Sequence, residues 1–183
     1  MSDKKHASKK ALLKLITEGT QTGESKLELH HRLSSAYYDS DLIAKLIAAF
    51  PNKDLKEKYK GLNNSLFILL LITAILKVLS ALPILLDNPR FGIIFFFLLP
   101  IFNIWFAIEV KKTRGYIYRI LGILAIAGIF RSIAQLDEQG AFALIEIGLL
   151  ILISALSFFL GIKMFPNYGL SGPKKDNSGN WVL

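Results

Sequence analysis

Cysteine is absent from the 183 residues of this chain. Without it the protein can form no disulfide bond, no reactive thiolate and no zinc site built on sulfur. The three histidines, His6, His30 and His31, all lie in the first 31 residues. His30 and His31 are adjacent, so on a helix they would point about 100° apart instead of toward one ion. The sequence therefore predicts no metal site and no other cofactor.

Catalytic signatures are absent as well. The chain contains no G-x-S-x-G, H-E-x-x-H, P-loop or G-x-G-x-x-G motif. Ser154 and Ser157 lie in a late apolar run, but no histidine follows residue 31 to act as a general base for either of them. An enzyme, and an intramembrane hydrolase in particular, therefore lacks its chemical groups, and we expect no enzymatic activity.

Charged residues are scarce over most of the chain. Lys, Arg, Asp and Glu make up 20% of the residues, whereas hydrophobic residues make up 52%. Of the 22 Lys and Arg residues, 12 lie in residues 1–60. The net charge of +8 is carried beside apolar runs and comes with no nucleic-acid-binding motif. We therefore expect contact with anionic lipid headgroups and not with nucleic acid.

Four long apolar runs follow the polar start, at residues 62–86, 91–108, 116–136 and 141–162. A helix needs about 20 such residues to cross a bilayer. The connectors are short and polar, so neighbouring helices must be antiparallel. Pro83 and Pro100 lie inside the first two runs and should kink them, and a re-entrant segment is an alternative for the second run. The predicted fold is all-α, an integral membrane four-helix bundle with a short helical N-terminal cytoplasmic segment.

Composition divides the chain into three parts. Residues 1–60 form a basic, helical segment in the cytoplasm or at the membrane surface, residues 61–163 form the four-span bundle, and residues 164–183 form a cytoplasmic tail. Within the first part, apolar residues at helical spacing predict three helices, of which the third covers 41–50. Ser40 should cap that third helix.

The first expected helix, residues 8–18, is amphipathic and basic, and Gly19 should end it. Leu12, Leu15 and Ile16 share one of its faces. The basic residues expected to contact anionic headgroups are Lys9, Lys10 and Lys14. A helix of this kind can lie on a membrane surface. The alternative is that its apolar face packs on the helices that follow.

The orientation in the membrane follows from the Lys and Arg residues near the helix ends. The second connector carries Lys111, Lys112 and Arg114, the first carries one basic residue, and the third carries none. Because Lys and Arg mark the cytoplasmic side, both chain ends and the second connector should be cytoplasmic. We expect the plasma membrane, which in a bacterium is the inner membrane. Aromatic residues near the run ends, such as Tyr118 and Phe165, suit the interfaces.

Five polar residues lie inside or at the edge of the apolar runs, where each is costly in lipid. They are Lys77, Asn103, Arg131, Gln135 and Glu146. Helical angles place each of them on a face with small or polar neighbours, which is typical of helix–helix contacts in membranes. Three interpretations stay open: the groups hold the bundle together, they line a cavity or dock a partner's helix, or they extend toward the interface without a role.

Arg131 and Glu146 lie at equal distances on either side of the third connector, so a tight hairpin would bring them to one depth. We predict an ion pair between them, since each charge alone is unfavourable in lipid. Lys77 is close enough in depth to join the pair. The cluster would then carry one positive charge in excess.

These features favour a non-enzymatic, multi-pass membrane protein that acts through protein–protein interaction, in an accessory, assembly or immunity-type role. Its partner would be another protein or a second copy of the chain. The alternative is a small transporter or channel subunit that uses the polar cluster. Four spans are few for a transport pathway without oligomerisation, and no pair of broken helices is evident.

Overall fold

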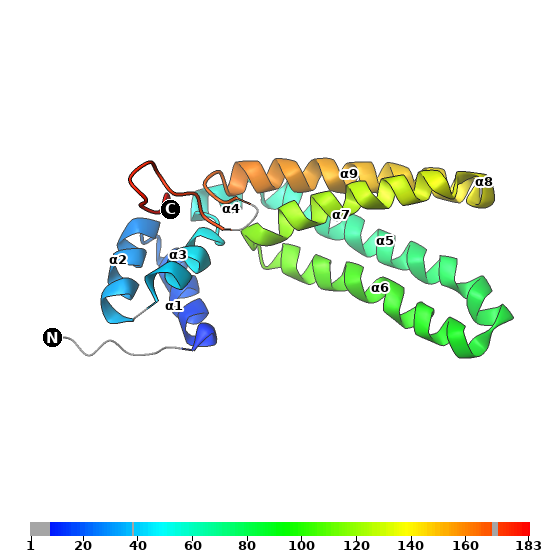
Figure 1. Cartoon of the computed structure of the whole chain (residues 1–183), viewed down its shortest axis with the longest axis horizontal. Helices are drawn as coiled ribbons and strands as arrows, with labels where there is room; N and C mark the ends of the chain where they lie inside the picture. The colour runs from blue at the N-terminus through cyan, green and yellow to red at the C-terminus, as the bar shows by residue number, and fades with distance from the viewer. Residues whose placement is uncertain (1–7, 38, 170–171) are drawn as a thin grey trace. The chain divides into compact units, whose positions relative to one another are not determined.

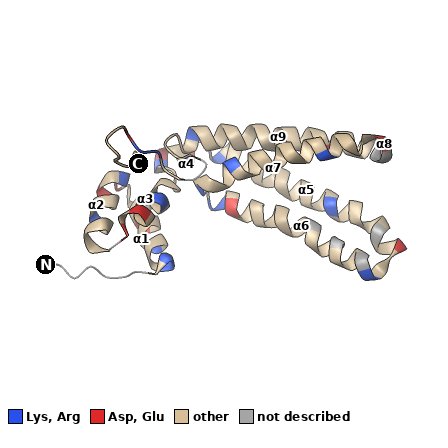
Figure 2. Cartoon of the chain, in the orientation of Figure 1, with Lys and Arg blue, Asp and Glu red and all other residues tan. Residues whose placement is uncertain are grey.

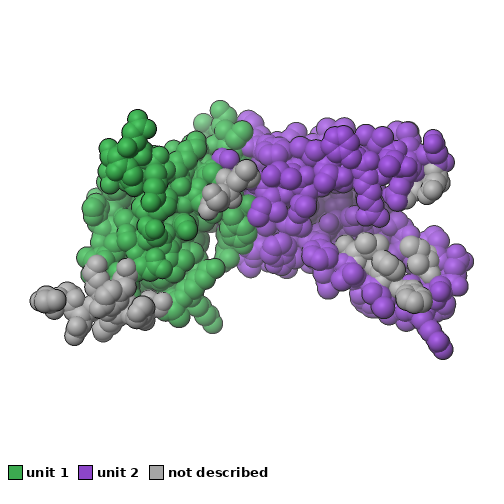
Figure 3. All heavy atoms as spheres, viewed as in Figure 1, with its two compact units in different colours: residues 1–59, 114–116, 161–183 green, residues 60–113, 117–160 purple. Residues whose placement is uncertain are grey.

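The computed structural model describes residues 8–37, 39–169 and 172–183. It is 80% helical, and no strand occurs in the described residues (Figure 1). The predicted all-helical fold class is therefore confirmed. Contacts divide the chain into two compact units: unit 1 is Met1–Tyr59, Arg114–Tyr116 and Gly161–Leu183, and unit 2 is Lys60–Thr113 and Ile117–Leu160 (Figure 3).

Unit 1 includes α1 (Lys9–Thr22), α2 (Lys26–Ala36), α3 (Ser40–Ala48) and α4 (Lys53–Lys58). α1 runs past Gly19, where the sequence predicted its end, and stops at Gly23, which has a φ of 84°. Gly19 lets α2 approach closely instead, because a Cβ there would lie 2.8 Å from Leu29 Cδ1. A glycine inside a helix costs about 1 kcal/mol relative to alanine, and this packing offsets that cost.

The cap of α3 also differs from the prediction. Asp39, and not Ser40, caps the helix, because the Asp39 carboxylate accepts a hydrogen bond of 2.8 Å from the Leu42 N–H. A carboxylate at this position also interacts favourably with the helix dipole. Ser40 Oγ lies 3.2 Å from His30 Nε2 on α2. His30 therefore takes part in helix packing within unit 1.

The core of unit 1 is built from one apolar face of each of its first three helices. Its buried members are Leu12 and Ile16 of α1, Leu29 and Leu33 of α2, and Ile43 and Ile47 of α3. The apolar face of α1 thus packs on the helices that follow, which was one of the two alternatives. That face is not free to enter a membrane.

The C-terminal tail is part of unit 1. Trp181 Nε1–H donates a hydrogen bond of 3.2 Å to Asp41 on α3, and the Lys175 ammonium lies 4.1 Å from the centre of the Trp181 ring. The Asp176 carboxylate accepts from two backbone N–H groups in the turn that follows it. These contacts tie the tail to the N-terminal helices.

Unit 2 is built from α5 (Lys60–Asp87), α6 (Pro89–Lys111), α7 (Gly115–Ala134), α8 (Leu136–Gln139) and α9 (Ala141–Met164), as Figure 1 shows. Among the described residues, α5, α6, α7 and α9 each contain a stretch long and apolar enough to cross a membrane. Pro83 and Pro100 lie inside α5 and α6, and both helices continue past them. The second apolar run is thus one continuous helix.

The surface of unit 2 is apolar. Apart from Leu27 and Ile162, which belong to unit 1, the exposed large hydrophobic residues of the described chain lie between Leu62 and Phe159 in unit 2. Figure 2 shows few charged residues along these helices, most of them near the helix ends. Such a surface is typical of helices that face lipid.

Candidate functional site

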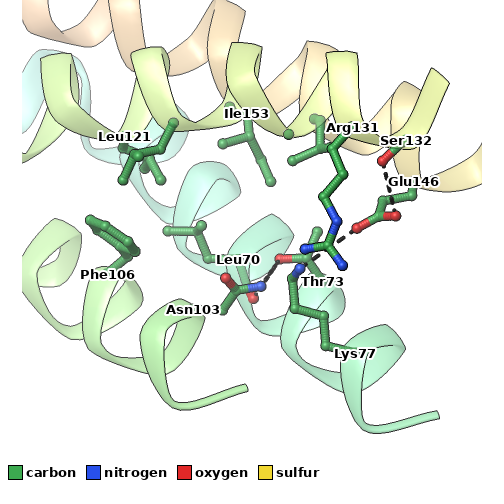
Figure 4. Close-up of a pocket in the computed structure, with 14 residues that line it drawn as sticks. Leu70, Thr73, Lys77, Asn103, Phe106, Leu121, Arg131, Ser132, Glu146 and Ile153 are labelled. Carbon is green, nitrogen blue, oxygen red and sulfur yellow. Dashed lines mark hydrogen bonds and ion pairs between the residues drawn. The ribbon is translucent and has the colours of Figure 1, made fainter. Parts of the chain in front are cut away.

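A pocket of about 140 Å³ lies within unit 2, among residues of α5, α6, α7 and α9 (Figure 4). It brings together four of the five predicted polar residues, namely Lys77, Asn103, Arg131 and Glu146. Gln135 is not among its lining residues. The sequence extended the third run to residue 136, but α7 ends at residue 134 and Gln135 lies in the turn before α8.

Glu146 on α9 is the centre of the polar contacts in this pocket. Its Oε1 lies 3.6 Å from the Lys77 ammonium of α5, and its Oε2 accepts a hydrogen bond of 3.1 Å from the Ser132 hydroxyl of α7. The Lys77 and Glu146 side chains are only 28% and 23% exposed. One carboxylate thus links three helices of unit 2.

Arg131 does not form the predicted ion pair with Glu146. Figure 4 shows its side chain pointing into the pocket near Lys77 and Glu146, but Glu146 is paired with Lys77, and no ion pair joins Arg131 to any residue that the structure describes. Ser132 holds the position on α7 that faces Glu146, and neighbouring residues on a helix point about 100° apart. The described residues that line the pocket thus include two basic side chains and one carboxylate.

Sequence reasoning missed the role of Ser132. Its hydroxyl connects α7 to α9 through Glu146, and Gly128 lies four residues earlier on the same helix. Two small residues at this spacing are typical of helix–helix contacts in membranes. That pattern is the signal that would have identified Ser132.

A neutral polar link joins α5 and α6 in the same pocket. The Asn103 amide donates a hydrogen bond of 2.9 Å to the Thr73 hydroxyl, which in turn donates to the Leu70 carbonyl at 2.9 Å. Each side chain has a hydrogen-bond partner within unit 2. A role in holding the helices together therefore accounts for this pair. It fixes two of the helices that frame the charged residues.

Close packing positions α7 against α9. A Cβ at Gly122 would lie 2.8 Å from the Phe158 ring, and one at Gly128 would lie 3.1 Å from Leu150. Ser154 Oγ donates a hydrogen bond of 3.3 Å to the Gly122 carbonyl. Glycine at these positions lets the two helices approach, which brings Ser132 within reach of Glu146.

Two aromatic residues that were expected at the membrane interfaces, Tyr118 and Phe165, are buried within the protein. Tyr118 donates a hydrogen bond of 2.6 Å to Asn63 Oδ1, and Asn63 donates one of 3.1 Å to the Val110 carbonyl. These contacts join α5, α6 and α7 within unit 2. Phe165, in unit 1, packs directly on Gly115. Each ring packs between segments that are distant in the sequence. The length and composition of the apolar runs do not reveal such packing.

Unit 1 has a groove of about 420 Å³, here named the Leu27 groove. It is lined by Thr20, Gly23, Glu24, Ser25, Lys26, Leu27, Asn52, Lys53, Asp54 and Leu183. Leu27 is 57% exposed. Arg32 holds Glu24 on its rim through two hydrogen bonds of 2.8 and 3.0 Å, and this guanidinium lowers the pKa of Glu24. The groove thus combines an exposed apolar side chain with charges of both signs.

Lys26 lies in the wall of the Leu27 groove and of a smaller adjoining hollow that Phe165 and Tyr168 also line. Burial lowers the pKa of Lys26 to about 8. At neutral pH most of this amine is charged, but a substantial fraction becomes a free base just above it. Sequence reasoning did not single out Lys26, since one lysine at a helix start has no pattern of its own.

The predicted lipid-contact residues line neither the pocket of unit 2 nor the Leu27 groove. Lys9, Lys10 and Lys14 are exposed on α1, and Lys14 lies 3.9 Å from Glu18, itself largely exposed. A pair this exposed contributes little stability. The three ammonium groups remain available to anionic headgroups, which is still a prediction.

The described residues contain no group of three or more His, Asp or Glu side chains that could hold a metal ion. The chain matches no protein family, no curated protein and no solved structure. Its function is therefore inferred from the pocket of unit 2 and the Leu27 groove of unit 1.

Proposed function

We propose that this chain is a non-enzymatic, multi-pass membrane protein that acts by binding another protein, in an accessory, assembly or immunity-type role. Unit 2 anchors it in the bilayer, and unit 1 binds the partner. The observation that carries this proposal is Leu27, a large hydrophobic residue that is exposed in the lining of a groove of unit 1.

The proposed location is a bacterial inner membrane with both chain ends in the cytoplasm. Four crossings leave the N-terminal segment, the second connector and the C-terminal tail on one side, and unit 1 contains residues from all three. These segments carry most of the Lys and Arg residues, which favours the cytoplasmic side. Lys9, Lys10 and Lys14 would add an attraction to anionic headgroups.

The Leu27 groove has the composition of a protein-binding surface. Binding energy in such surfaces concentrates in a few apolar anchors surrounded by polar groups. Leu27 supplies the anchor, and two carboxylates and two ammonium groups line the same groove, namely those of Glu24, Asp54, Lys26 and Lys53. Charges of both signs suit a partner segment with an apolar residue between charged neighbours.

Site-specific cross-linking of the full chain tests this proposal. Because the chain has no cysteine, Leu27→Cys gives a single thiol at the groove, and Ala11→Cys, at an exposed position of α1, gives a matched thiol outside it. A thiol-to-amine cross-linker in intact cells should join the Leu27→Cys protein to one partner in stoichiometric yield. Equal products from both variants, or none from either, would show that the groove binds no protein.

The second candidate is a small transporter or channel subunit, which the charged pocket of unit 2 favours. In that case the purified chain should form a homo-oligomer and conduct ions in liposomes. Arg131→Gln should reduce the flux, whereas Leu27→Ser should not affect it. A monomer without flux would leave protein binding as the function.

A further inference from the structure

The charges in the pocket of unit 2 do not balance. Among the described residues that line the pocket, Lys77 and Arg131 provide two basic groups and Glu146 provides the one carboxylate. Glu146 is engaged by Lys77 and Ser132. An uncompensated guanidinium between apolar helices is unfavourable unless it reaches water or an anion. The pocket therefore suits a ligand with one negative charge.

The pocket is also divided into a charged side and an apolar side. Figure 4 shows Arg131, Lys77 and Glu146 together on one side and Phe106 and Leu121 on the other. Leu121 precedes Arg131 by ten residues, which is about 15 Å along α7. A ligand that fills both sides must join an anionic head to an apolar chain.

The depth of the charges matches a lipid headgroup. Arg131 lies three residues before the end of α7, Glu146 five residues after the start of α9, and Lys77 ten residues before the end of α5. At about 1.5 Å per residue these positions are roughly 5, 8 and 15 Å from the helix ends. Because basic side chains extend toward the nearer interface, Arg131 can reach the phosphate level of one leaflet, whereas Lys77 lies deeper and can contact a phosphate that enters the pocket.

The size of the pocket favours a lipid over a protein helix. A helix with side chains is about 10 Å in diameter, whereas a cavity of about 150 Å³ holds a molecule the size of benzene. The pocket of about 140 Å³ admits a phosphate group together with a short length of alkyl chain. The surrounding bilayer would accommodate the rest of the molecule.

We propose that this pocket is a binding site for an anionic phospholipid. Arg131 and Lys77 contact the phosphate, and one acyl chain runs along the apolar side formed by Leu121, Phe106 and Leu70. Charge-assisted hydrogen bonds from a guanidinium to phosphate give the selectivity. This site is separate from the Leu27 groove and does not depend on the proposed protein partner.

Native mass spectrometry of the full chain in dodecyl maltoside tests the proposal. The probes are dioleoyl phosphatidylglycerol, dioleoyl phosphatidylcholine and inorganic phosphate. Wild type should bind one phosphatidylglycerol about tenfold more tightly than phosphatidylcholine, since one charge-assisted hydrogen-bonded contact has about that value. Arg131→Gln should lose this preference and Arg131→Lys should keep most of it. Arg90→Gln, at an exposed arginine outside the pocket, is the matched control.

Three outcomes would overturn the proposal. The first is an equal preference for phosphatidylglycerol in wild type and Arg131→Gln, when circular dichroism shows both to be folded. The second is full displacement of the lipid by millimolar phosphate, which would identify a site for a soluble anion. The third is a purified chain that binds neither lipid and retains a second protein through Arg131. Leu27→Ser should leave the lipid preference unchanged. Failure of the protein-binding proposal can therefore be distinguished from failure of the lipid-binding proposal.

Discussion

At the scale of single residues, the two sites differ in how their charges are neutralised. Glu146 has two contacts that lower the cost of a carboxylate among apolar helices, from Lys77 and from Ser132. Lys26 has no such contact among the described residues, and burial lowers its pKa to about 8. The pairing of Glu146 in unit 2 and the desolvation of Lys26 in unit 1 can therefore be measured separately.

Lys26 should react with acylating reagents at lower pH than an ordinary lysine. With a pKa near 8 instead of 10.5, its free-amine fraction at pH 8 is about 100-fold larger. The rate of modification at Lys26, followed by mass spectrometry, should reach half its plateau near pH 8. A half-point near pH 10 would show that the amine is fully hydrated.

The same shift has a defined sign for stability. Because the folded state lowers the pKa of Lys26 from 10.5 to about 8, folding disfavours the charged form. The free energy of unfolding should therefore fall as the pH drops from about 10.5 to 8 and be unaffected by Lys26 below that. Lys26→Met should remove this part of the pH dependence, whereas Lys9→Met should not.

Lys77 and Glu146 should be coupled in a double-mutant cycle. Lys77→Met and Glu146→Gln should each destabilise the protein in detergent, and the double variant should lose less than the sum by about 0.5–3 kcal/mol. The matched cycle of Arg131→Met with Glu146→Gln should give a smaller coupling. Thermal unfolding followed by circular dichroism measures both, and a larger coupling for Arg131 would restore the pairing that the sequence predicted.

At the scale of helices, the sequence predicted where the helices lie in the chain, but not which of their residues contact one another. The apolar runs locate α5, α6, α7 and α9, because a crossing helix needs about 20 apolar residues whatever its neighbours are. Which side chains pair inside the pocket depends on how each helix is rotated about its axis. The equal depth of Arg131 and Glu146 does not determine that rotation. Gly19 shows the same limit, since its role is to let Leu29 approach and not to end α1.

The packing of α7 on α9 should tolerate a larger residue at one glycine and not at another. Gly122→Val places a side chain where a Cβ already lies 2.8 Å from the Phe158 ring, whereas Gly148 has nothing within 4 Å. Overpacking costs typically about 1–3 kcal/mol. The melting temperature in detergent should therefore fall for Gly122→Val and stay near wild type for Gly148→Val. Equal melting temperatures would mean that the two helices separate readily.

At the scale of the whole molecule, membership of unit 1 limits how the chain can be threaded through a membrane. Unit 1 contains residues 1–59, residues 114–116 at the end of the second connector, and the tail. Within it, Gly115 N–H donates a hydrogen bond of 2.8 Å to the Ala49 carbonyl. Segments in contact must lie on one side of a bilayer. The chain must therefore cross the bilayer an even number of times between any two of these segments.

The side on which unit 1 lies follows from thiol labelling of intact cells. The chain has no cysteine, so each variant carries one reactive group. Asn88→Cys and Asp137→Cys, in the connectors with few basic residues, should react with an impermeant reagent added outside. Lys112→Cys and Ser178→Cys should react only after lysis, because the basic flanks favour the cytoplasmic side. Reaction of Ser178→Cys in intact cells, with protection of Asn88→Cys, would reverse the orientation, and reaction of Lys112→Cys together with Asn88→Cys would contradict a crossing by α6.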